Sequence, residues 1–171
     1  MLIKIYFIFN DIIILGDFML KYLKYFLLSM VPIIELRGSV PWAIASGVNP
    51  FLALFICIIG NILPVPFIYL FARKILEWGQ DKKIIGKFFK FCLKKGNKAG
   101  KKLEKNTGIG IFIAIMLFVG IPVPGTGAWT GTLGASILNL KFKDTIIAVS
   151  LGVLLAGIIM AIFTLGLIKI I

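Results

Sequence analysis

Histidine is absent from the 171 residues, aspartate and glutamate together number only seven, and there are two cysteines. The chain therefore lacks the commonest general base and the commonest metal ligand. Few carboxylates leave little for paired-carboxylate catalysis, and two cysteines without histidine make no zinc site. We expect no enzyme active site, no metal and no cofactor. Because Cys57 lies in an uncharged run and Cys92 in a basic stretch, we also expect no disulfide.

Charged residues make up only 15% of the chain, whereas 60% of the residues are hydrophobic and the mean hydropathy is +1.04. A soluble domain is usually about half apolar and about a quarter charged, so this composition is typical of a membrane protein. It excludes a disordered chain, a collagen and a disulfide-rich secreted module. We expect one multi-pass membrane domain, residues 1–171, in the plasma membrane of a bacterium or an archaeon.

Most of the net charge of +12 lies in one stretch, residues 73–105, where twelve basic residues face three acidic ones. Lysine and arginine resist translocation, so a basic stretch beside a long apolar run belongs in the cytoplasm. We expect no nucleic-acid binding, because no such motif is present and the flanking apolar runs account for the charge. Apolar residues at helical spacing between the lysines predict a helix in the membrane interface, or else a solvated helical connector: Ile84, Ile85, Phe88, Phe89 and Cys92.

Three runs contain no charged residue: residues 38–72, 106–140 and 145–168. A spanning helix needs roughly 20 apolar residues, so the last run predicts one span. Each of the other two is too long for one span and too short for two, and both are rich in proline and glycine. We predict breaks at residues 32–41 and 120–131, and long apolar helices at residues 51–72 and 145–168.

The apolar stretches before the two breaks are short, at residues 25–34 and 109–119. Eleven helical residues cover about 16 Å, against roughly 30 Å of hydrocarbon, so each break should be a re-entrant hairpin. The same order occurs twice and predicts an all-α fold of two inverted-repeat units, each a re-entrant helical hairpin plus a long transmembrane helix. Its segments would be an N-terminal apolar segment (1–24), the first unit (25–72), a basic cytoplasmic helical linker (73–107) and the second unit (108–171).

In this topology the first hairpin opens outward and the second opens into the cytoplasm, with Lys141 and Lys143 inside. Lys21 and Lys24 would lie outside, against the usual distribution of lysine. The N-terminal segment is either a poor first span or, if translation starts at Met19, not part of the protein.

Glu35 and Arg37 are the only charged residues in the first predicted break. Ionisable groups at membrane depth are costly and usually functional. A low dielectric disfavours a carboxylate's charge and a nearby cation restores it, so Glu35 could alternate between two protonation states in a proton-coupled carrier. Arg37 could hold an anionic substrate group by forked hydrogen bonds. The alternative is that the two residues pair with each other or cap broken helix ends.

The second predicted break has no charge but offers exposed backbone groups that could bind ions or anionic groups. Its candidate site residues are Pro122, Pro124, Gly125, Thr126, Gly127 and Trp129. Trp129 could line a substrate path or anchor at an interface. Small residues predict close helix packing at Gly127 with Gly131, and at Gly152 with Ala156 and Gly157. Asn61, with Pro64 and Pro66, should kink the first long helix, and would be a site residue if it faced the hairpins.

Residues 32–41 (PIIELRGSVP), the Gly60-Asn61 pair and above all residues 122–131 (PVPGTGAWTG) resemble the small multi-drug export proteins. That family is placed with the wider DedA-like membrane proteins, and the resemblance covers about residues 25–166. It implies paired re-entrant hairpins and an export role. The DedA-like group implies proton-linked handling of lipid carriers or drug-like cations by acidic and arginine residues in the hairpins. The acidic position here is Glu35, whereas residues 124–127 lack the arginine that the wider group often has in its second hairpin.

Our first hypothesis is therefore a small secondary transporter or lipid-carrier flippase, proton-coupled through Glu35, with Arg37 as anion-binding or conformational partner. Its partners would be membrane lipids and a small-molecule or lipid substrate, and a homo-oligomer is compatible with the sequence. The alternative is a non-transporting scaffold or a holin-like pore, recognised by unselective leakage. Two paired breaks argue against a simple pore, which needs no broken helices.

Overall fold

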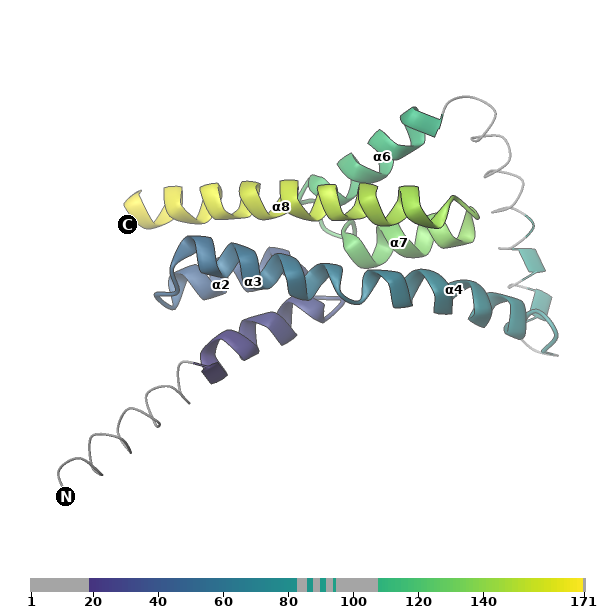
Figure 1. Cartoon of the computed structure of the whole chain (residues 1–171), viewed down its shortest axis with the longest axis horizontal. Coiled ribbons are helices and arrows are strands. Elements are labelled where there is room, and N and C mark those ends of the chain that lie inside the picture. Colours follow the sequence, from purple (N-terminus) through teal and green to yellow (C-terminus); the bar gives the residue numbers. More distant parts are fainter. Residues whose placement is uncertain (1–18, 83–85, 88–89, 92–93, 95–107, 171) are drawn as a thin grey trace, which may run out of the picture.

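The computed structural model describes residues 19–82, 86–87, 90–91, 94 and 108–170 (Figure 1). All regular elements in these ranges are helices, as predicted. They are a helix over residues 19–30, α2 (Glu35–Ala45), α3 (Pro50–Ile62), α4 (Val65–Gly79), α6 (Gly108–Gly120), α7 (Ala128–Ile137) and α8 (Phe142–Ile170). The residues predicted to pattern the linker helix, Ile84, Ile85, Phe88, Phe89 and Cys92, lie outside the described residues, as do residues 1–18.

Two helical stretches are long and apolar enough to cross a membrane, Pro50–Gly79 and Phe142–Ile170. They match the long helices predicted at residues 51–72 and 145–168, and both extend further. The first begins at Pro50, where the side chain of Asn49 accepts a hydrogen bond from the backbone N–H of Phe51 over 3.0 Å. It is interrupted by a turn at Leu63 and Pro64, where the kink was predicted.

Both predicted breaks are present, but each is shorter than predicted. The first comprises residues 31–34, so that Pro41, predicted to lie in the break, is inside α2. The second comprises residues 121–127, so that Gly131 is inside α7. Tertiary packing explains the difference, because it routinely overrides local propensity. The helix α2 packs on α3 and α8 and fully buries Leu36 and Val40, which lie about one helical turn apart.

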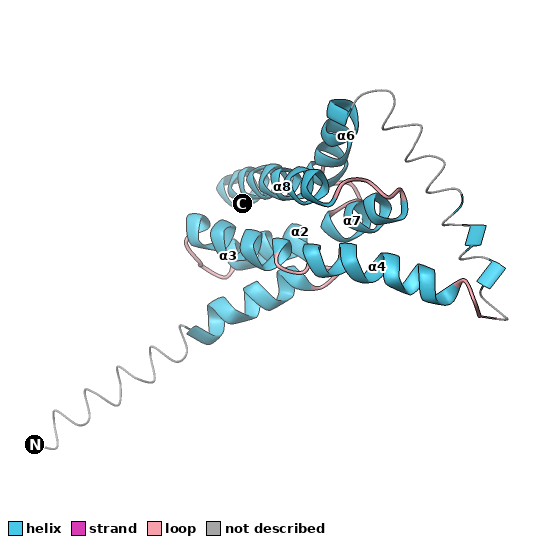
Figure 2. Cartoon of the chain, turned by 45° about the vertical axis from the view of Figure 1, so that its right-hand side comes forward, coloured by secondary structure: helices cyan, strands magenta, loops and turns pink. Residues whose placement is uncertain are grey.

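The two breaks meet near the middle of the long helices. In Figure 1, helix 19–30 and α2 open toward the end where α3 begins, and α6 and α7 open toward the opposite end, where α4 ends. Each returning short helix packs on the long helix of the other half, α2 on α8 and α7 on α4. Figure 2 shows that α6 crosses α8 steeply, and these two helices are also in contact. The halves are therefore interlocked rather than placed side by side.

The returning helices α2 and α7 end in the same way. The backbone N–H of Val48 donates to the carbonyl of Ala43 over 3.0 Å, and that of Leu140 donates to Ala135 over 3.1 Å. A residue with positive φ precedes each donor, Gly47 at 76° and Asn139 at 57°. This is a helix stop of the Schellman type, in which the left-handed residue is usually glycine or asparagine.

The long helices carry glycines at corresponding places. A Cβ added at Gly60 would meet the carbonyl of Phe26, and one at Gly152 would meet the carbonyl of Met116 at 2.6 Å. Gly60 and Gly152 are separated by the same interval along the chain as Gly47 and Asn139. Each glycine lets its long helix approach the backbone of the first short helix of its half, so the prediction of close packing at Gly152 is confirmed.

The two lysines that oppose the predicted topology make specific contacts. The Lys21 ammonium donates to the carbonyl of Ser46 over 2.9 Å, at the C-terminal end of α2. The Lys24 ammonium lies 4.8 Å from the centre of the Trp42 ring. A cation at a helix C-terminus and over an aromatic face is favourable. These contacts give both lysines a structural role that is independent of membrane sidedness.

Candidate functional site

Glu35 is the first residue of α2, and its carboxylate lies at the start of α7. The backbone N–H of Trp129 donates to Glu35 Oε1 over 3.1 Å, and Glu35 is only 5% exposed. Gly127, the N-cap residue of α7, has no side chain that could cap the helix. A Cβ added at Gly127 would overlap the Glu35 carboxylate. Glu35 therefore caps α7 from the other half of the protein, where a negative charge also meets the positive end of the helix dipole.

Arg37 binds the opposite kind of helix end. Its Nη2 donates to the carbonyls of Val119 and Ile121, each over 3.1 Å, and to the Thr126 hydroxyl over 2.7 Å. Its Nη1 donates to the carbonyl of Val123. These acceptors lie at the C-terminus of α6 and in the turn after it, where the helix itself supplies no donors. The positive charge also complements the negative end of the α6 dipole.

Trp129 makes the reciprocal contact. Its indole Nε1 donates to the carbonyl of Met30, the last residue of helix 19–30, over 3.0 Å. The separation in sequence between Arg37 and Trp129 equals that between Gly47 and Asn139, so Arg37 and Trp129 occupy corresponding positions in the two halves. Each half therefore sends one donor, from the same place in its returning helix, to the carbonyl end of the other half's first short helix.

Glu35 and Arg37 bind across the junction rather than to each other. In the part of the chain that the structure describes, the recorded ion pair is the exposed one between Arg73 and Glu77, and none joins Glu35 to Arg37. The structure therefore shows the alternative in which Glu35 and Arg37 cap the ends of broken helices. The same described residues contain no group of three or more Cys, Asp or Glu side chains that could hold a metal ion.

A cavity of about 290 Å³ adjoins these contacts. It is lined by residues of both breaks and of the helices that follow them: Pro32, Ile33, Ile34, Glu35, Arg37, Pro124, Gly125, Thr126 and Thr130. The carboxylate and the guanidinium thus face one space between the two halves. We call the contacts of Glu35, Arg37 and Trp129, together with this cavity, the junction.

The family model described as "Putative small multi-drug export protein" matches residues 35–159. The chain belongs to this family. The match begins at Glu35 and includes α2, the second break and most of α8, hence most of the junction. No curated protein and no solved structure matches the chain. The family and the two apolar helices indicate a membrane protein, and the family name suggests the export of small molecules.

Most of the predicted site residues come together at the junction. The junction contains Glu35, Arg37, Pro124, Gly125, Thr126, Gly127 and Trp129. Pro122 lies in the same break, next to Val123, whose carbonyl accepts from Arg37. Asn61 is buried on α3, and its side-chain oxygen has no hydrogen-bond partner among the described residues. Asn61 is not among the residues that line the junction cavity.

The hydrogen-bond acceptors of the junction could not be predicted from the sequence, because they are main-chain carbonyls. They belong to Met30, Val119, Ile121 and Val123. Every residue has such a carbonyl, so residue type carries no signal for it. The available signal was indirect: a helix broken at membrane depth leaves carbonyls that need donors, and Arg37 is the one basic residue in the two predicted breaks.

Proposed function

We propose that this protein is a proton-coupled secondary exporter in the plasma membrane. Its two units would be inverted re-entrant hairpins, each followed by a spanning helix, with the junction near the bilayer midplane. The observation that carries this proposal is the cross-capping of the breaks, since Glu35 and Arg37 of one unit bind the broken helix ends of the other. Irregular backbone at membrane depth is tolerated only where it is buried in protein or lines a cavity, and residues of both breaks line the junction cavity.

Protonation of Glu35 would weaken one side of the junction. As a carboxylate, Glu35 accepts from the Trp129 N–H and stabilises the start of α7 by its charge. As a neutral acid it keeps at most a hydrogen bond, while Arg37 stays attached to the end of α6. The two halves would then be held less strongly on the Glu35 side, and the cavity could open there. Binding of a proton is in this way coupled to a change of conformation.

The proposed substrates are drug-like cations, whose charge would enter the cavity beside Glu35, or lipid carriers. Arg37 is assigned the conformational role rather than the binding of an anion, because its terminal nitrogens already serve three carbonyls and one hydroxyl. The chain departs from the DedA-like pattern in having its acidic and basic hairpin residues, Glu35 and Arg37, in the first hairpin alone. A holin-like pore is the alternative, and the capped helix ends argue against it.

The Glu35→Gln variant tests proton coupling. We expect it to insert and fold but to abolish transport of ethidium, a drug-like cation, in proteoliposomes with an imposed pH gradient. Glutamine can still accept from Trp129, whereas it cannot change charge. Glu77→Gln is the matched control, because Glu77 is an exposed acid paired with Arg73, far from the junction in sequence. Normal transport by Glu35→Gln would refute the role of this carboxylate, and leakage that is unselective and independent of Glu35 would favour the pore.

Cysteine labelling tests the inverted arrangement. Ser46 follows α2 and Lys143 lies in the first turn of α8, and both are exposed. In a background with Cys57→Ala and Cys92→Ala, a membrane-impermeant maleimide should label Ser46→Cys in intact cells. It should label Lys143→Cys only after the cells are permeabilised. Labelling of both positions from the same side would exclude hairpins that open to opposite faces.

A further inference from the structure

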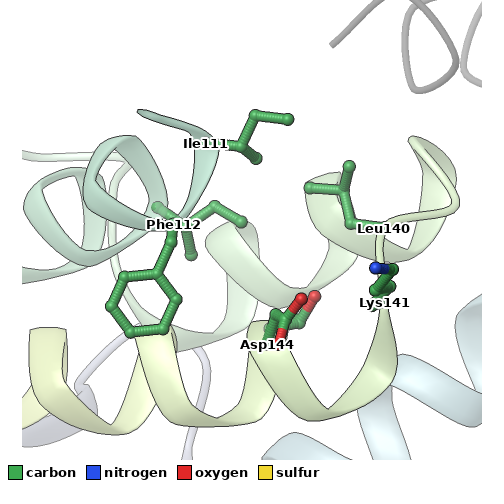
Figure 3. A pocket seen from close by; sticks show the side chains of 7 residues that line it. Ile111, Phe112, Leu140, Lys141 and Asp144 are labelled. Atoms are coloured by element: carbon green, nitrogen blue, oxygen red, sulfur yellow. The ribbon is translucent and has the colours of Figure 1, made fainter. Parts of the chain in front are cut away.

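A second cavity lies away from the junction, at the end of the protein where α8 begins. It has a volume of about 400 Å³ and is formed by α6, the turn after α7 and the first turn of α8. Its lining residues are Ile111, Phe112, Ile115, Leu140, Lys141, Asp144 and Thr145. Figure 3 shows Asp144 and Lys141 on the α8 side of this space, with Ile111 and Phe112 on the α6 side. One wall is therefore charged and the other is apolar.

The polar groups of this cavity are not used by the protein itself. Lys141 and Asp144 carry opposite charges, yet neither forms an ion pair within the described residues. Thr145 is only 1% exposed, and its hydroxyl has no hydrogen-bond partner in the same part of the chain. Buried hydroxyl groups nearly always have a partner. The Thr145 hydroxyl is not accessible from the cavity, but the cation and the anion that line it point to a ligand that carries both charges.

An apolar groove continues from this cavity toward the junction. It has a volume of about 380 Å³, lies between α6 and α7, and shares Ile111, Ile115 and Leu140 with the charged cavity. Its other lining residues are Gly110, Ala114, Phe118, Thr130, Gly131, Gly134, Ala135 and Leu138. These positions follow α6 over most of its length, and Thr130 also lines the junction cavity. The groove is nearly free of polar surface, so it suits a long apolar chain.

We propose that the cavity and the groove together hold one phospholipid with an amine-bearing zwitterionic headgroup. The headgroup phosphate binds Lys141 and the headgroup ammonium binds Asp144. An acyl chain lies in the groove between α6 and α7. The charged end is at the start of a spanning helix, where headgroups lie, and the apolar end points to the middle of the long helices.

Charge complementarity selects this lipid class. A purely cationic amphiphile would be attracted by Asp144 and repelled by Lys141, and a purely anionic lipid would meet the reverse. Only a headgroup with both charges satisfies the two side chains, which is specificity by repulsion as well as attraction. The site does not depend on which substrate is exported or on proton coupling at Glu35.

Lipid retention by the full-length protein tests the headgroup. The protein is reconstituted in nanodiscs with equal amounts of phosphatidylethanolamine and phosphatidylglycerol, re-extracted, and analysed by native mass spectrometry. We expect about a fivefold preference for phosphatidylethanolamine, the ratio given by one exposed charge-assisted contact. Asp144→Asn should bring the ratio close to one, whereas Asp81→Asn, an exposed acid outside the cavity, should leave it unchanged.

A glycine-to-leucine pair tests the groove. A Cβ added at Gly134 would meet no atom within 4 Å, so leucine there fills the groove without disturbing the protein, and retained lipid of both kinds should be lost. Gly166→Leu on α8 is the matched control, since that position is equally open but lies outside the groove. The proposal is wrong if the wild type retains no phospholipid, if it prefers phosphatidylglycerol, or if Gly134→Leu retains lipid as the wild type does. None of these results depends on ethidium transport.

Discussion

Replacing Arg37 with alanine should lower the free energy of unfolding by about 2–3 kcal/mol, because hydrogen bonds to a charged group contribute about 1.5–3 kcal/mol. The partly buried carbonyl of Val119 would lose the Arg37 donor, whereas the carbonyls of Ile121 and Val123 would keep hydrogen bonds from Val123 and Thr126. The α6 end would also lose the positive charge that complements its dipole. Thermal or denaturant unfolding of the detergent-solubilised protein, followed by circular dichroism, measures this loss.

Two further variants show whether geometry or charge matters at Arg37. Arg37→Lys keeps the charge but not the planar fork that reaches several oxygens, so its stability should lie between those of the wild type and Arg37→Ala. Arg73→Ala removes an arginine whose partner, Glu77, is exposed, and should cost about 1 kcal/mol or less. If Arg37→Ala is no more destabilised than Arg73→Ala, the cross-capping contributes nothing to stability.

Gly127→Ala should destabilise the protein by about 3 kcal/mol, because two unfavourable effects coincide at this residue. Its φ of 135° lies in a region that glycine adopts without strain and other residues rarely adopt. A Cβ would also overlap the Glu35 carboxylate and push it away from the Trp129 N–H. The expected result is a large drop in the unfolding midpoint and a reduced yield of folded protein.

The control for this variant lies in the same helix. At Gly134 an added Cβ meets no atom within 4 Å, so Gly134→Ala should match or exceed the wild-type stability by up to about 1 kcal/mol through its better helix propensity. The double variant Gly127→Ala with Glu35→Ala should lose less than the sum of the two single losses, since the overlap is then removed. Strictly additive losses would show that the overlap with Glu35 is not the cause.

The helices were predictable because their signals are local. Long uncharged runs identified both long helices, and proline with glycine identified both breaks. The extents of the breaks were wrong at Pro41 and Gly131, since both residues are helical in the structure. A proline removes one hydrogen bond and a glycine weakens a helix, but burial of Leu36 and Val40 in α2 outweighs such local costs.

The sequence by itself determined that the chain is an apolar helical membrane protein and where its helices break, because composition and proline chemistry depend on residue type. It also identified Glu35 and Arg37 as exceptional, because burying a charged side chain is costly. Only the tertiary structure decided what these side chains bind. Arg37 reaches the Val123 carbonyl 86 residues away, and Glu35 reaches the Trp129 N–H 94 residues away. Main-chain groups are alike at every position, so their pairing emerges only once packing has brought the two halves together.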